Sequence, residues 1–164
     1  MLLSTLLALP PLAALGWSMA REDMATTRVA MWKLTAFTAV ALAWSLATGA
    51  LAQGRGESLA GSVLAAGTGL LVGWLVSKRL GREAFGGADV WILAGGGAVV
   101  GVQWVGPWIG LSVIVGLAMF LFAARPDHEN PDGRSILPFV PTLLLALAPI
   151  ALGRVFGLLP PIPF

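Results

Sequence analysis

The sequence of 164 residues contains no cysteine and only one histidine, His128. The absence of cysteine excludes disulfide bonds, thiolate metal ligands and cysteine nucleophiles. A single histidine also excludes a multi-histidine metal site. We therefore expect no metal and no cofactor, and carboxylates are the best-supplied catalytic groups. A serine or threonine nucleophile stays open, although no surrounding motif indicates one.

Charge is also scarce, because charged residues make up only 11% of the chain and hydrophobic residues 57%, with a mean hydropathy of +0.87. Soluble globular domains carry roughly 25% charged residues. The net charge of +2 is too small and too scattered to indicate a nucleic-acid partner. This composition predicts an integral membrane protein whose surface is covered mostly by the lipid bilayer.

The apolar residues occur in runs long enough to cross a membrane, which requires about 20 residues per helix. Six stretches meet this requirement: residues 2–20, 34–53, 58–77, 89–106, 107–124 and 136–156. A Gly-Pro pair within QWVGPW (Gln103 to Trp108) is expected to separate the fourth span from the fifth. No basic residue precedes the first run, so we interpret it as a span and not as a cleaved signal peptide. The predicted fold is all-α, a single domain over residues 1–164 formed by a bundle of six transmembrane helices.

The basic residues predict the orientation of this bundle. The loops after the first, third and fifth spans hold eight of the ten: Arg21, Arg28, Lys33, Lys78, Arg79, Arg82, Arg125 and Arg134. Only Arg55 and Arg154 fall on the other side. Because positively charged loops stay in the cytoplasm, we expect a multi-pass membrane protein with both termini outside.

Two further residue types fit membrane helices. Glycine pairs spaced four apart, which let helices approach closely, are Gly69 with Gly73 and Gly97 with Gly101. Tryptophan is enriched at membrane interfaces. We expect Trp17, Trp32, Trp74 and Trp91 at the inner interface and Trp104 and Trp108 at the outer one.

The eight carboxylates sort by their place in this topology. Most have ordinary surroundings: Glu57 lies outside, Glu83 has basic neighbours, and Asp127, Glu129 and Asp132 sit in the polar loop RPDHENPDGRS. Glu22, Asp23 and Asp89 remain. Asp23 follows the first span and Asp89 opens the fourth, so both are expected at the cytoplasmic boundary of the membrane.

Two interpretations of Asp23 and Asp89 are open at this point. Asp89 could cap the helix that begins at VWILAGGGAVV, and Asp23 could be one more charge in a cytoplasmic turn. Alternatively, the two carboxylates lie together and share one proton, so that one activates a water molecule and the other polarises a carbonyl group. Gly86 and Gly87 favour the second interpretation, because backbone without side chains lets another chain approach Asp89.

Three segments occur in order along the chain: REDMATTRVAMWKLT (Arg21 to Thr35), GREAFGGADVWILAGGGAVVG (Gly81 to Gly101) and ILPFVPTLLLALAPIAL (Ile136 to Leu152). Together they resemble the type IV prepilin peptidases, membrane aspartic proteases whose second catalytic aspartate lies in a GxGD motif. The first segment is similar to the family's first-aspartate segment and the second to its GxGD segment. The third is similar to the Pro-Phe-x-Pro opening of the family's last span.

The resemblance implies that Asp23 and Asp89 are the two catalytic aspartates and that Gly86, Gly87 and Ala88 form the glycine motif beside the substrate. It also implies a substrate class, namely prepilin-like or archaellin-like precursors with a short basic leader followed by a hydrophobic helix. It further implies the inner (plasma) membrane of a prokaryote, with cleavage expected at the cytoplasmic membrane face. Because the chain lacks cysteine, it resembles the compact form without the cysteine-rich insertion, and N-methyltransferase activity is not expected.

The chain departs from the family pattern at three places. Ala88 replaces the glycine before the second aspartate, Ala30 and Met31 replace a Pro-Asn pair, and Trp91 replaces a common lysine. The changes at Ala88 and Trp91 leave open an inactive family member that serves as an assembly scaffold, while Ala30 and Met31 imply a differently shaped loop. A small transporter with Asp89 as its proton or cation site is a further alternative, although such a site favours the middle of the membrane. The oligomeric state stays open.

Overall fold

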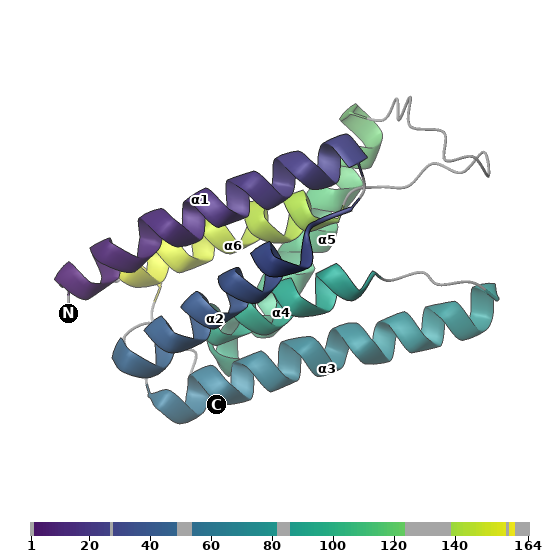
Figure 1. Cartoon of the computed structure of the whole chain (residues 1–164). Helices are drawn as coiled ribbons and strands as arrows, with labels where there is room; N and C mark the ends of the chain where they lie inside the picture. The colour runs from purple at the N-terminus through teal and green to yellow at the C-terminus, as the bar shows by residue number, and fades with distance from the viewer. Residues whose placement is uncertain are drawn as a thin grey trace.

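The structure is a computed structural model that describes residues 2–26, 28–48, 54–81, 86–123, 139–156 and 158–159. In these ranges the chain forms helices and no strand: α1 (Leu2–Thr26), α2 (Met31–Thr48), α3 (Arg55–Leu80), α4 (Gly87–Val100), α5 (Val102–Ala123) and α6 (Val140–Val155) (Figure 1). The all-α prediction is therefore confirmed. Glu83, the loop with Asp127, Glu129 and Asp132, and the tail from Pro160 lie outside the described residues.

The glycine-rich helix α4 lies at the centre of the bundle and contacts α2, α3, α5 and α6. Successive residues of an α-helix are about 100° apart, so the three consecutive glycines Gly95–Gly97 face three different neighbours. A Cβ on the first glycine would lie 3.0 Å from the Phe37 ring of α2. On the second it would overlap the Trp108 ring of α5, and on the third the Gly61 carbonyl of α3. The absence of side chains therefore lets three helices pack directly on the backbone of α4.

Helices α3 and α4 pack closely against each other. A Cβ on Gly61 would overlap the Gly97 carbonyl oxygen and lie 2.9 Å from the Cα of Gly101. The predicted role of Gly97 and Gly101 in close helix packing is thus confirmed, and Gly61 is a glycine partner that the sequence did not identify.

The boundary between α4 and α5 differs from the prediction. Gly101 ends α4 with a φ of 75°, a left-handed conformation that glycine adopts without strain, and α5 begins at Val102. Pro107 lies inside α5, so the expected break at QWVGPW is wrong. A proline in a helix removes one backbone hydrogen bond, which helices of membrane proteins tolerate.

The tryptophans separate into exposed and buried ones. Trp17, Trp32 and Trp74 are 67%, 65% and 58% exposed, as an interfacial position requires. Trp108, by contrast, is fully buried, and its indole N–H donates a 3.0 Å hydrogen bond to the Leu143 carbonyl of α6. The predicted interfacial role of Trp108 is therefore wrong, because its ring fills the space beside Gly96 in the core.

Two segments of the described chain are long and apolar enough to cross a bilayer, Arg55–Arg79 in α3 and Val102–Met119 in α5. Only 28% and 22% of them are buried, which leaves most of their apolar surface facing outward. The six expected spans stay a prediction. The C-terminal end of α1 and the N-terminal ends of α2, α4 and α6 lie at the same end of the bundle (Figure 1).

Candidate active site

Asp23 lies in the last turns of α1 and is 7% exposed. Its Oδ2 accepts a 3.2 Å hydrogen bond from the backbone N–H of Val140, the first residue of α6. The first amides of a helix have no partner within the helix and attract negative charge. Pro141, the next residue, has no N–H to offer. The start of α6 therefore holds the Asp23 carboxylate through the Val140 amide.

Asp89 is the third residue of α4 and is 8% exposed. Its Oδ2 accepts a 3.2 Å hydrogen bond from the backbone N–H of Gly86, which precedes the helix. The capping interpretation of Asp89 is thus correct in part. Asp89 does not precede the helix but lies in its first turn, and from there its carboxylate binds the N–H of Gly86, the residue before the helix. This bond fixes the Asp89 side chain relative to its own helix.

The two carboxylates interact although they are 66 positions apart in the sequence (89 − 23). Burial raises the pKa of Asp23, and the hydrogen bond from Val140 opposes this change. The pKa of Asp89 is raised to about 6, chiefly by burial and to a smaller extent by the negative charge of Asp23, while the Gly86 hydrogen bond opposes this change. Both aspartates lie outside Arg55–Arg79 and Val102–Met119. A pair of this kind retains one proton near neutral pH more readily than two isolated carboxyls do.

The residues of the predicted glycine motif lie directly before Asp89. Gly86 and Gly87 are exposed, and a Cβ added at Gly87 would meet no atom within 4 Å. Ala88 is partly buried and packs against the hydrophobic core. Backbone beside the Asp89 carboxylate is therefore open to an approaching chain, while contact with a substrate stays a prediction.

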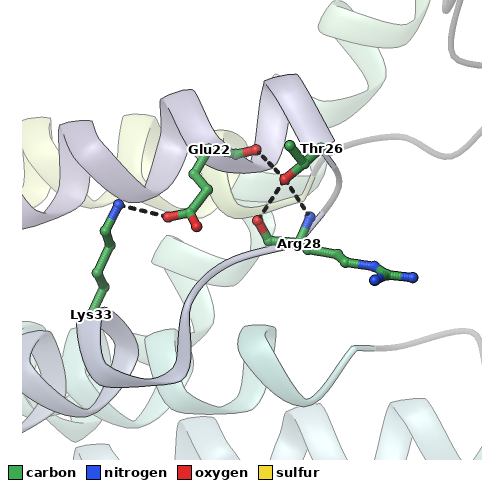
Figure 2. Close-up of polar contacts among 4 residues, drawn as sticks. All are labelled: Glu22, Thr26, Arg28 and Lys33. Atoms are coloured by element: carbon green, nitrogen blue, oxygen red, sulfur yellow. Dashed lines mark hydrogen bonds and ion pairs between the residues drawn. The ribbon is translucent and has the colours of Figure 1, made fainter.

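Glu22, the third carboxylate singled out from the sequence, has a different partner. It forms a 2.6 Å ion pair with Lys33 of α2, as Figure 2 shows. Beside it, the Thr26 hydroxyl donates to the Glu22 carbonyl at 2.9 Å and accepts the Arg28 N–H at 3.3 Å. These contacts tie the short connection between α1 and α2. Among the described residues, no three side chains of metal-binding type form a group that could hold an ion.

An apolar groove of about 350 Å³ between α1 and α6 is a feature that the sequence analysis missed. Its walls include Leu12 and Gly16 of α1 and Leu144 of α6. Gly16 lies seven residues before Asp23, which is about two helical turns, so both lie on the same face of α1. Leu144 lies about one turn after Val140, so these two residues also lie on the same face of α6. The groove therefore leads away from the Asp23 carboxylate along α1 and α6.

These observations define an all-helical, strongly apolar protein with a pair of interacting, buried aspartates at one end of its bundle. The chain belongs to the type IV leader peptidase family, whose model matches residues 12–124. The matched range includes Asp23 and Asp89 but ends before the third segment, Ile136 to Leu152. Searches among curated proteins and among solved structures find no match. The family predicted from the sequence is confirmed.

Proposed function

We propose that the protein is an aspartic endopeptidase that removes the leader from type IV prepilin-like or archaellin-like precursors, with Asp23 and Asp89 as its catalytic pair. The observation that carries the proposal is the electrostatic interaction of two buried carboxylates in a member of the leader peptidase family. Each carboxylate accepts one backbone N–H at 3.2 Å and keeps a second oxygen for chemistry.

The reaction is peptide-bond hydrolysis with one proton shared by the pair. One ionised carboxylate takes a proton from a water molecule, whose oxygen then bonds to the scissile carbonyl carbon. The protonated carboxyl donates its proton to the carbonyl oxygen as the tetrahedral intermediate forms. Breakdown of this intermediate breaks the C–N bond: the carboxyl that is now protonated gives its proton to the leaving nitrogen, and a hydroxyl of the intermediate gives its proton to the other carboxylate as the carbonyl re-forms. The pair then holds one proton again.

The membrane placement belongs to the same proposal. Arg21, Lys33 and Lys78 lie near helix ends on the side of the carboxylates, whereas Arg55 starts α3 and Arg154 lies in the last turn of α6. A six-span arrangement with both termini outside would put the aspartates at the cytoplasmic face. Arg154 donates to the Val100 carbonyl at the opposite end of α4.

The groove between α1 and α6 supports a precursor as substrate. A prepilin-like precursor has its cleavage site directly before an apolar helix, so the start of that helix must lie just beyond the carboxylates. The groove begins about two turns beyond Asp23 and is lined by apolar side chains. Exposed Gly86 and Gly87 would leave room for the leader beside Asp89.

Co-expression with a pilin-like precursor tests the proposal, with the shortened product detected on a gel. We expect cleavage by the wild type and none by Asp23→Asn or Asp89→Asn, while all three proteins reach the membrane. Glu57→Gln is the matched control, since Glu57 lies in the first turn of α3 away from the pair. Full cleavage by either aspartate variant removes that residue from the pair, and a wild type that binds precursors without cleaving any supports the scaffold alternative.

A further inference from the structure

The two helices that carry the aspartates do not pack against each other. In the described structure α1 and α4 share no close backbone contact, and both contact α2 and α6. The Asp89 bond to Gly86 lies within its own helix end, so it does not set the distance to Asp23. The gap between the two carboxylates therefore depends on the helices that lie between α1 and α4.

Helix α2 makes a polar contact with each aspartate-bearing helix, in each case beside the aspartate. Lys33 pairs with Glu22, the residue before Asp23, at 2.6 Å. The Thr38 hydroxyl donates a 2.8 Å hydrogen bond to the carbonyl of Trp91, two residues after Asp89. Lys33 and Thr38 are five residues apart, about 7.5 Å along the helix axis.

The bond made by Thr38 differs from that of several other hydroxyls among the described residues. A hydroxyl in a helix commonly bonds to the carbonyl four residues back in its own helix. Among the described residues, the side chains that do so include Thr26, Thr35, Thr68 and Ser112. Thr38 is 4% exposed and instead reaches the neighbouring helix.

Gly95 makes this contact possible. A Cβ added at Gly95 would lie 3.1 Å from the Cα of Thr38, so any larger residue would push α2 away from α4. The Trp91 carbonyl lies within the first two turns of α4, in the part of the helix that carries Asp89. The Thr38 bond therefore fixes the N-terminal part of α4 against α2.

The Lys33 contact joins α2 to α1, the helix that carries Asp23. The Lys33 and Glu22 side chains are 18% and 29% exposed, so water screens this ion pair less than a pair at the open surface. Figure 2 shows Lys33 reaching from α2 to Glu22 on α1, next to the connection tied by Thr26 and Arg28. The ion pair thus joins the start of α2 to the turn of α1 that holds Asp23.

We propose that α2 is the positioning element of the aspartate pair, with Lys33 and Thr38 as positioning residues that set the distance between the Asp23 and Asp89 carboxylates. The inference rests on the proposed peptidase function. Neither residue is expected to touch the substrate. Their loss therefore lowers kcat and leaves KM nearly unchanged.

The test compares matched variants in precursor cleavage. Thr38→Val keeps the shape of the side chain and removes the hydroxyl, and we expect kcat to fall about tenfold, since small misplacements of reacting groups are costly. Thr38→Ser keeps the hydroxyl and should restore most of the rate. Thr35→Val is the control, because Thr35 is an exposed threonine of the same helix that bonds its own Met31 carbonyl.

Lys33→Met supplies a second variant at a less buried position. We expect a fall in kcat of about threefold, as the ion pair is partly screened. Lys78→Met is its control, because Lys78 lies over the Trp74 ring of its own helix α3, and in the described ranges α3 has no close backbone contact with α1. Wild-type kcat in both Thr38→Val and Lys33→Met would overturn the positioning role.

Thiol cross-linking tests the distance between positions 23 and 89 without a measurement of activity. The chain has no cysteine, so Asp23→Cys with Asp89→Cys introduces two unique thiols for a short bifunctional thiol reagent. Adding Thr38→Val should slow the cross-link several-fold relative to adding Thr35→Val, and equal rates would overturn the positioning role. A wild type that cleaves no precursor would overturn the peptidase proposal. The cross-linking rates would still show whether α2 sets the distance between positions 23 and 89.

Discussion

The backbone N–H of Val140 donates a hydrogen bond to Oδ2 of Asp23, which lies 117 residues earlier in the chain. This bond joins the start of α6 to the end of α1 beside the second aspartate-bearing helix. It favours the charged form of Asp23, although burial of the carboxyl acts in the opposite direction and is the larger effect. Asp23 and Asp89 thus differ in their donors, one from a distant helix and one from the adjacent chain.

Replacing Asp23 should change the titration of Asp89. Asp23→Asn removes a negative charge that raises the pKa of Asp89, so this pKa should fall below its value of about 6. Carboxylate infrared bands or carbon NMR of labelled aspartate in detergent micelles would measure the change. Glu57→Gln is the control. An unchanged Asp89 pKa in Asp23→Asn would show that the two carboxylates do not interact.

The activity should decline as the pH rises through the pKa of Asp89. If Asp89 holds the shared proton, the protonated form needed for catalysis is lost above about pH 6. At low pH the other carboxylate, which must be ionised to act as the base, becomes protonated. We therefore expect a bell-shaped dependence of kcat/KM on pH. Its two apparent pKa values describe the pair as a whole and not either aspartate alone. A rate that still rises between pH 6 and pH 9 would contradict a shared proton.

Asp89→Asn should stabilise the protein at alkaline pH while it abolishes cleavage. The folded-state pKa of Asp89 is raised, so the folded protein binds a proton more tightly than the unfolded chain, and the stability of the wild type falls as the pH rises from about 4 to above 6. Neutral asparagine avoids this loss. The gain at pH 8 should be about 1 to 3 kcal/mol, since one pKa unit corresponds to about 1.4 kcal/mol. Thermal unfolding in detergent at pH 8 and pH 4 measures it, and the gain should vanish at pH 4.

Substitution at the centre of α4 should loosen the bundle. A Cβ at Gly97 would overlap the Gly61 carbonyl and lie 2.7 Å from the Cβ of Ala65. These atoms belong to a packed helix and cannot move easily, so Gly97→Ala should lower the free energy of unfolding by about 1–3 kcal/mol. Gly67→Ala on α3, where an added Cβ meets no atom within 4 Å, is the control and should be neutral or slightly stabilising. Denaturant titration compares the two.

Filling the groove should weaken substrate binding more than chemistry. A Cβ at Gly16 lies at 3.5 Å from the Leu144 side chain, so the longer Gly16→Leu side chain must enter the groove. We expect KM for a precursor to rise about tenfold with a small change in kcat. The reason is that the lost contacts stabilise the bound substrate and the transition state equally. Gly110→Leu on α5, in open space, is the control. An unchanged KM would show that the precursor helix binds elsewhere.

Several elements of the fold could be predicted because their causes are local. Apolar runs predicted six helical segments, and the order of the Asp23 and Asp89 segments identified the family. The break before α5 was misplaced because both Gly101 and the Gly106-Pro107 pair are plausible turn signals. Only the packing of Gly101 against Gly61 distinguishes them. Trp108 was misassigned for the same reason, since its burial depends on the space that Gly96 leaves free.

The sequence by itself determined the apolar helices, the scarcity of catalytic groups other than carboxylates, and the family. These properties follow from composition and from residues near each other in the chain. The tertiary structure alone decided that the amide of Val140 holds Asp23, that Thr38 reaches the Trp91 carbonyl, and that α1 and α6 enclose a groove. Such contacts join residues far apart in sequence, and for Thr38 and the Trp91 carbonyl the geometry depends on how closely Gly95 lets α2 approach α4.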